Sequence, residues 1–319
     1  MNEKLITFIE SSFLSDLLKE PEITDISYNG VALFYMHNTK GRKKSDISLS
    51  NEDATNFIRQ IANLSERQFS YSSPNLDISV GRYRINAVHS SIVRVKDDKA
   101  ISFVIRIASS TLRIKPDGSF MPKKMDSFLL DSLKEHKSIV IGGSVGSGKT
   151  ELQKYLLSSL DDFTRIIIID NVQELDYLER KENLDITCWQ IQPNNPNASI
   201  SNLVRIALRS NPDWLIVAES RGAEMNELLN SVMTGHPIIT TMHVKNLANM
   251  PLRMARMVEA AKVSETHEEI LSDIYSHFDV FIYLERKITK TGLIKRYVSS
   301  IGVSEANKLK TIYQRGNEV

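Results

Sequence analysis

An eight-residue segment of this sequence has the composition and spacing of a loop that binds phosphate groups. It begins at Gly143 and ends in Gly148-Lys149-Thr150, which fits the pattern G-x-x-x-x-G-K-[ST]. Glycines let backbone N–H groups approach a phosphate closely, and a helix that begins at the loop adds a favourable dipole. We expect the whole segment to bind nucleotide phosphates: Gly143, Ser144, Val145, Gly146, Ser147, Gly148, Lys149 and Thr150.

The last two side chains of this loop have separate expected tasks. Lys149 would reach the β- and γ-phosphates, and the Thr150 hydroxyl would bind Mg²⁺. The expected ligands are therefore ATP and Mg²⁺.

Acidic side chains follow two apolar segments farther along the chain. Glu219 ends the run 214–218, and Asp170 ends the run 165–169, with Glu174 four residues later. A carboxylate at the end of a strand beside a phosphate loop can order water around Mg²⁺, the role expected for Glu219. Either Asp170 or Glu174 would direct or deprotonate the attacking water, and the sequence leaves the choice between them open.

Two histidines flank another apolar segment, 238–242. His243 follows its carboxyl end, where nucleotide sites lie in sheets of this kind, so we expect it to sense or polarise the γ-phosphate. His236 precedes the segment and is expected to have a structural role in a turn.

The elements that must position these side chains alternate regularly. Apolar runs of strand type occur at 138–141, 166–169, 214–218, 238–242 and 280–284, with helical segments between them. This alternation predicts a mostly parallel sheet covered by helices. The fold class is therefore α/β, a RecA-like P-loop NTPase domain preceded by a smaller α/β domain.

The chain is expected to form two domains. Residues 1–110 contain short strand and helix signals, and we predict that they form an N-terminal α/β domain. Residues 111–124 hold Pro116, Gly118 and Pro122, so this stretch predicts a linker. Residues 125–319 form the expected ATPase domain. The basic segment 40–44 is predicted to be a solvated hairpin turn.

Composition narrows the class of protein. The chain has 319 residues and a net charge of +1, so no direct nucleic-acid binding is expected. The single cysteine, Cys188, excludes a disulfide framework and a four-cysteine zinc module. No apolar run approaches the roughly 18–20 residues that cross a bilayer, so no transmembrane segment is expected. The amphipathic N-terminus lacks the features of a signal peptide, which predicts a cytoplasmic protein.

Together these segments resemble the secretion traffic ATPases of type II and type IV secretion, conjugation and pilus assembly. The family's phosphate loop, acidic box, second acid and histidine box match 143–150, 170–174, 219 and 235–243. The resemblance extends to 24–30 and 81–87 in the first domain, to 208–222 around the second acid, and to 278–284 and 295–298 near the C-terminus. The type IV secretion and conjugation branch is the most similar, because the zinc insertion is absent.

This resemblance implies properties that the motifs alone do not give. Such enzymes form hexameric rings and bind nucleotide between their two domains, which implies that the N-terminal domain, residues 1–110, closes over the nucleotide. They work with inner-membrane secretion or pilus machine proteins, so a peripheral position at the inner face of the cytoplasmic membrane is expected. The resemblance also implies that Arg84 and Arg106 reach the γ-phosphate and that Arg221 helps to neutralise phosphate charge.

One departure from the family pattern leaves the activity open. The acidic box usually begins with Glu-Asp, whereas this chain has Asp170-Asn171. The shorter side chain withdraws the carboxylate by about 1.5 Å, one carbon–carbon bond. The main hypothesis is an export motor that hydrolyses ATP. The alternative is a nucleotide-gated ring scaffold with negligible turnover that recruits secretion-machine partners, and a helicase is the least favoured because no basic stretch is interleaved with aromatic residues.

Overall fold

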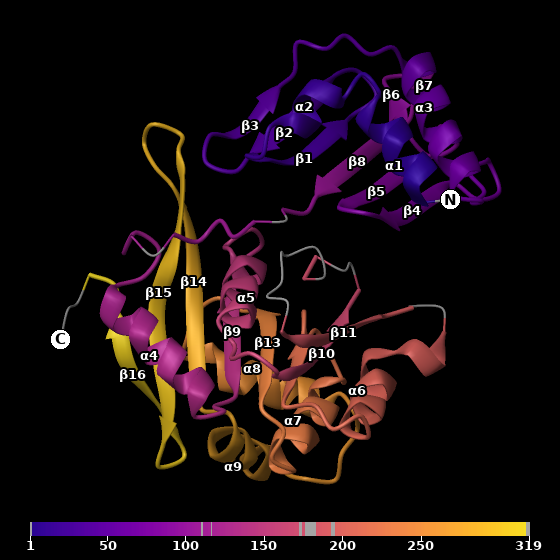
Figure 1. Ribbon diagram of the computed structural model, residues 1–319. Helices are drawn as coiled ribbons and strands as arrows, with labels where there is room; N and C mark the ends of the chain where they lie inside the picture. The colour runs from indigo at the N-terminus through magenta and orange to yellow at the C-terminus, as the bar shows by residue number, and fades with distance from the viewer. Residues whose placement is uncertain are drawn as a thin grey trace. The chain divides into compact units, whose positions relative to one another are not determined.

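A computed structural model describes residues 2–109, 111–115, 117–171, 174–175, 183–192 and 195–316, and the chain divides into two compact units. Unit 1 comprises Met1–Ser110 together with Ile288–Lys295, and unit 2 comprises Thr111–Lys287 together with Arg296–Val319. Figure 1 labels the elements of both. Unit 1 thus includes a short segment from the distant part of the sequence.

Unit 1 is built on a six-stranded sheet with the strand order β3-β2-β1-β8-β5-β4. All of the pairs in this sheet are antiparallel. The strands are β1 (Ile23–Tyr28), β2 (Leu33–His37), β3 (Gly41–Lys44), β4 (Asn75–Val80), β5 (Tyr83–Val88) and β8 (Ser102–Ile107), and a small ribbon consists of β6 (Arg94–Val95) and β7 (Asp98–Lys99). Residues 41–44, predicted as part of a turn, form the edge strand β3.

The helices of unit 1 are α1 (Asn2–Glu10), α2 (Ser15–Lys19) and α3 (Asn51–Leu64). Leu5 and Ile9 from α1 are buried in the core of the unit, as the helical spacing of the N-terminal apolar residues predicts. At the start of α3 the Ser50 hydroxyl accepts a hydrogen bond from Asp53 N and so caps the helix.

Unit 2 contains an eight-stranded sheet with the order β11-β10-β12-β13-β9-β14-β15-β16. The pairs from β11 to β14 are parallel, and β15 pairs with β16 in antiparallel fashion. The strands are β9 (Ile139–Gly143), β10 (Arg165–Asp170), β11 (Asp185–Gln190), β12 (Trp214–Val217), β13 (Ile238–His243), β14 (Val280–Ile288), β15 (Ile294–Glu305) and β16 (Lys308–Gln314). Cys188 lies on the edge strand β11 and is half-buried.

Helices cover both faces of this sheet (Figure 1). They are α4 (Lys123–Lys134), α5 (Lys149–Ser158), α6 (Ile200–Leu208), α7 (Met225–Met233), α8 (Asn249–Glu259) and α9 (His267–His277), with a short 3-10 helix at Pro196–Ala198. Successive strand residues face opposite sides: Ile139 and Ile141 pack with α4 and α5, whereas Val140 packs with α6 to α9. This three-layer arrangement confirms the predicted α/β fold class.

The strand register of unit 2 brings the predicted site to one edge of the sheet. His243 is aligned with Gly143 across the β13–β9 pair, and Val217 is aligned with Thr240 across the β12–β13 pair. Because parallel strands share one direction, the residues that follow β9, β12 and β13 emerge together. The phosphate loop, Glu219 and His243 therefore meet at the carboxyl edge.

We predict that Phe281→Ala lowers the free energy of unfolding of unit 2 by about 3–5 kcal/mol, because the ring is fully buried in the central strand β14. Phe163→Ala is the matched control, since Phe163 is 80% exposed, and it should change the value by less than about 0.5 kcal/mol. Tryptophan fluorescence in urea measures both, because Trp189 and Trp214 belong to unit 2. Equal effects of the two substitutions would contradict the expected packing.

Candidate functional site

The phosphate loop joins β9 to α5 and depends on glycine at several positions. Gly146 and Gly148 have φ angles of +70° and +100°, in the left-handed region that glycine adopts without strain. A side chain at Gly143 would meet the Ser147 hydroxyl and would lie 2.8 Å from Leu284 O. The loop is therefore packed too closely at its start for any residue with a β-carbon.

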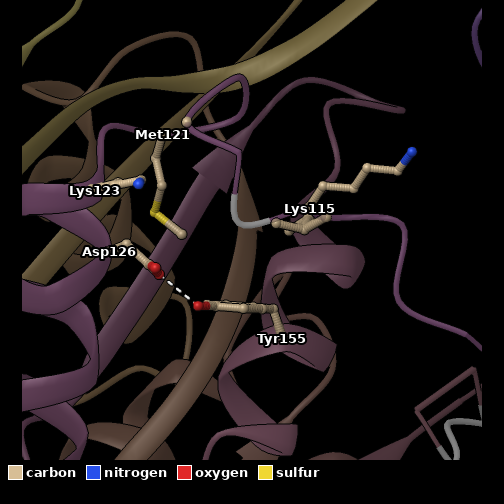
Figure 2. A pocket seen from close by; sticks show the side chains of 7 residues that line it. Lys115, Met121, Lys123, Asp126 and Tyr155 are labelled. Atoms are coloured by element: carbon tan, nitrogen blue, oxygen red, sulfur yellow. Dashed lines mark hydrogen bonds between the residues drawn. The ribbon is translucent and has the colours of Figure 1, made fainter.

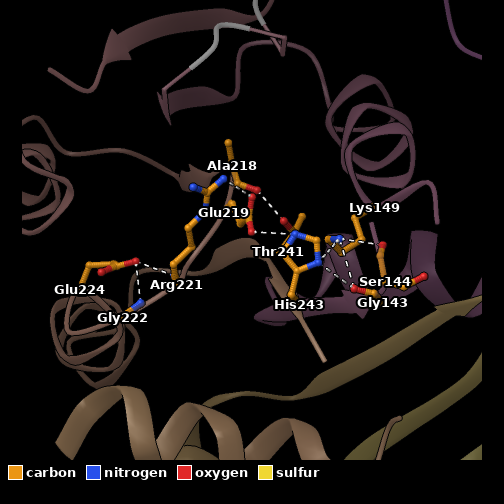
Figure 3. A network of polar contacts seen from close by, with 10 residues as sticks. All are labelled: Gly143, Ser144, Lys149, Ala218, Glu219, Arg221, Gly222, Glu224, Thr241 and His243. Atoms are coloured by element: carbon orange, nitrogen blue, oxygen red, sulfur yellow. Dashed lines mark hydrogen bonds and ion pairs between the residues drawn. The ribbon is translucent and has the colours of Figure 1, made fainter. Parts of the chain in front are cut away.

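Lys149 begins α5, and its side chain folds back across the loop (Figure 3). Its Nζ donates hydrogen bonds to Gly143 O and Ser144 O, each at 3.2 Å, and lies 3.3 Å from His243 Nδ1. Burial lowers the pKa of Lys149 to about 8, with the Glu219 carboxylate opposing this shift and Arg221 adding to it. The ammonium thus lies against the backbone carbonyl groups at the start of the loop.

Glu219 connects the other charged groups of the site. One carboxylate oxygen, Oε2, accepts a hydrogen bond from Arg221 Nη2 at 2.9 Å, and Oε1 lies 3.1 Å from His243 Nε2. The carboxylate raises the pKa of Arg221. Figure 3 shows that Arg221, Glu219, His243 and Lys149 follow one another across the edge of the sheet. The structure therefore brings these four predicted residues together.

The residues present fit a magnesium ion bound together with a nucleotide. Ser147 Oγ is buried and has no hydrogen-bond partner among the described residues, Glu219 offers the carboxylate oxygen that lies beside His243 Nε2, and the Thr150 hydroxyl lies in the first turn of α5. These are hard oxygen donors of the kind that Mg²⁺ prefers. The described residues contain no group of three or more His, Cys, Asp or Glu side chains that could hold a metal. A magnesium ion here would therefore depend on phosphate and water oxygens as well.

Asp170 ends β10 at the same edge of the sheet, but its carboxylate is engaged in the following turn. The side chain is 3% exposed, and Oδ2 accepts a hydrogen bond from Leu175 N at 3.4 Å. Glu174 lies in that turn and is half-buried. The geometry gives Asp170 a structural task in addition to the predicted catalytic one, and the choice between the two acids stays open.

Arg84 and Arg106 belong to unit 1, where they face one another across the β5–β8 pair. Arg84 Nη2 lies 3.5 Å from Asp77, and Arg106 Nε lies 3.4 Å from Asp25. Each guanidinium thus has a carboxylate partner on its own sheet. Their expected contact with the γ-phosphate stays a prediction.

Several residues near the loop were not selected from the sequence. Arg296 Nε donates to Gly146 O at 2.6 Å, and the Thr241 hydroxyl donates to Ala218 O at 2.7 Å. Gln153 is fully buried between α5 and the sheet. Position 153 shares an apolar helix face with Leu157 and Leu160, so a polar residue there was a signal that the sequence offered. Nothing in the sequence linked Arg296 to the loop.

A small hollow lies beside α5, between this helix and α4 (Figure 2). Tyr155 Oη donates to Asp126 Oδ1 at 2.6 Å, and burial together with this hydrogen bond raises the pKa of Tyr155 to about 12. The hollow holds about 10 Å³, room for roughly one water molecule. It is therefore too small for a nucleotide base.

Comparison with known proteins gives the class to which this fold and site belong. The family model described as type II/IV secretion system protein matches residues 88–287. The chain therefore belongs to the type II/IV secretion system protein family, which confirms the resemblance inferred from its motifs.

Individual relatives support the type IV branch. An uncharacterised protein of Bacillus anthracis is 28% identical over 287 residues, which cover 89% of this chain and 64% of the relative. The type IV secretion system protein VirB11 of Brucella suis is 31% identical over 150 residues, 46% of this chain and 40% of VirB11. The chain thus matches less than two thirds of the length of either relative.

A solved structure shares the fold. The crystallised ATPase DotB of Legionella pneumophila superposes with a TM-score of 0.69 at 21% identity, over 92% of this chain and 80% of DotB.

Within the described ranges, none of the helices combines the length and the apolarity needed to cross a bilayer.

The lowered pKa of Lys149 predicts a particular pH dependence of stability. Folded Lys149 loses its proton near pH 8, whereas the unfolded side chain keeps its proton up to about 10.5. The unfolded state therefore binds more protons between these values, so Lys149 adds a contribution to the free energy of unfolding that rises with pH across this window. Urea unfolding of the nucleotide-free protein should show this rise, and Lys149→Met should lack it. Identical pH profiles for the two proteins would contradict the assignment.

Proposed function

We propose that the protein is a hexameric ATPase that couples ATP hydrolysis to macromolecular export or to assembly of a type IV secretion, conjugation or pilus apparatus. Its place would be at the inner face of the cytoplasmic membrane, with inner-membrane secretion or pilus machine proteins as partners. The observation that carries this proposal is the contact of Lys149 with His243, which in turn contacts Glu219. Membership of the type II/IV secretion family supports it.

The proposed reaction is in-line attack of water on the γ-phosphate of ATP. Lys149 would exchange its contacts with Gly143 O and Ser144 O for phosphate oxygens, with the loop N–H groups supplying further donors. His243 would then respond to the γ-phosphate, because its imidazole lies between Lys149 and Glu219. Bound Mg²⁺, held by Thr150 and Glu219, would neutralise phosphate charge.

The remaining candidate residues would act around this centre. Arg221 would add positive charge near the transferred group, and Asp170 or Glu174 would orient the water. In the proposed cycle ATP closes the first domain over the second, Arg84 and Arg106 add their charges to the γ-phosphate, and hydrolysis releases the first domain again. Repeated closure around a ring would supply the mechanical work.

Lys149→Ala should abolish Mg²⁺-dependent ATP hydrolysis, because it removes the ammonium that faces the phosphates. The matched control is Lys134→Ala, which removes an exposed lysine on α4 and should keep the wild-type rate. Phosphate release measures turnover, and light scattering with ATP measures the size of the oligomer. Undiminished turnover by Lys149→Ala would refute the motor, and a monomer with ATP would refute the ring.

A second candidate function is a nucleotide-gated ring scaffold with negligible turnover. The observation that favours it is the buried carboxylate of Asp170, which is engaged with Leu175 N. A base held in this way is less available to a water molecule. Tight ATP binding without hydrolysis, even in the presence of partner proteins, would identify the scaffold.

Asp170→Ala separates the structural and catalytic tasks of this carboxylate. If Asp170 directs the water, kcat should fall about 10²–10⁴-fold, the usual contribution of a general base, while ATP affinity is kept. Asp170→Ala should also lower the free energy of unfolding, because Leu175 N loses its acceptor. Asp170→Asn retains that acceptor but removes the base, so its kcat should fall as far while its free energy of unfolding stays near that of wild type. Normal kcat in Asp170→Asn would transfer the role to Glu174.

A further inference from the structure

The buried amide of Gln153 links the phosphate-loop helix to two strands of the sheet. Its side chain is fully buried, and Nε2 donates to Val217 O at 3.0 Å and to Ile239 O at 3.3 Å. Gln153 stands four residues after Lys149 on α5, which is about one turn of helix. A single side chain thus contacts β12 and β13 from the helix that begins at the loop.

Both strands lead directly into the candidate site. Val217 precedes Glu219 by two residues, and Ile239 precedes His243 by four. Beyond the amide, the two strands are joined again by the hydrogen bond between Ser220 N and Thr241 O at 2.8 Å. The position of the Gln153 amide is therefore coupled to the spacing between the Glu219 carboxylate and the His243 imidazole.

An apolar residue would serve packing better at this position. Gln153 Oε1 is buried and has no hydrogen-bond partner in the part of the chain that the structure describes, and an unpaired buried acceptor destabilises a fold. Leucine or methionine would fill the same space without that cost. The amide instead donates two directed hydrogen bonds, which an apolar side chain cannot make. These hydrogen bonds set the distance of α5 from each strand.

We propose that Gln153 is a positioning residue that holds the phosphate loop in register with Glu219 and His243. Its side chain is fully buried and acts through the ends of β12 and β13. The inference rests on the proposed ATPase function, because the geometry that Gln153 fixes is the one that would serve hydrolysis. Displacement of reacting groups by about 1 Å reduces rates by about a hundredfold, so a small shift of these strands is sufficient to affect turnover.

Gln153→Met tests the inference, since it keeps the side-chain volume and removes both hydrogen bonds. We expect kcat to fall about tenfold to a hundredfold, with the dissociation constant for Mg·ATP within about threefold of wild type. Tyr155→Phe is the matched control, because it removes one hydrogen bond from the same helix, to Asp126 on α4 (Figure 2). The control should leave kcat unchanged.

Gln153→Glu provides a pH readout that a structural role would not give. A protonated carboxyl group can donate one of the two lost hydrogen bonds, whereas the ionised group faces two carbonyl oxygens and donates none. Burial favours the protonated form. The kcat of Gln153→Glu relative to wild type should therefore rise as the pH falls, whereas the same ratio for Gln153→Met should stay flat.

The NMR signal of the His243 imidazole separates this inference from the proposed function. The signal is assigned by its loss in His243→Gln and is recorded without nucleotide, so it needs no turnover. Gln153→Met should shift it, and Tyr155→Phe should not. If wild type hydrolyses no ATP, the proposed motor fails while this measurement still decides the role of Gln153. An unshifted His243 signal in Gln153→Met, or an equal shift in Tyr155→Phe, overturns the inference.

Discussion

Parallel pairing of β9 with β13 aligns Gly143 with His243, and the candidate site depends on this register. The loop that follows Gly143 carries Lys149 back across the strand end, where its ammonium reaches both Gly143 O and the His243 ring. A shift of β13 by one residue would turn His243 to the opposite face of the sheet. Such a shift would also separate the buried hydroxyls of Thr240 and Thr241 from their partners, Ser220 Oγ and Ala218 O, each at 2.7 Å.

Burial and charge compensation act against one another in this site. Desolvation lowers the pKa of Lys149 to about 8, and the carboxylate of Glu219 favours the charged form. Glu219 is itself divided between Arg221 and His243. Phosphate oxygens would offset the cost of burying the Lys149 ammonium and would compete with its backbone carbonyl partners, so the electrostatics of the site favour binding of an anion.

Much of the site could be predicted from the sequence because its chemistry is local. The glycines and Lys149 occupy fixed spacings, and Glu219 and His243 end strongly apolar segments, so their meeting at one edge followed from parallel pairing. The α/β class, the phosphate loop and the family were accessible for the same reason. Position 41, predicted within a turn, starts a strand instead, because the edge of the first sheet gives the segment 41–44 a pairing partner in β2.

The sequence by itself determined the phosphate loop, the alternating strands and helices, and the acids and histidine that terminate the strands, because periodicity and spacing specify these features within short segments. Only the tertiary structure decided which atoms meet. Asp170 accepts a hydrogen bond from the turn that follows it, and Gln153 reaches two strands that lie far from it in sequence. These contacts depend on strand order and helix packing, which no local pattern encodes.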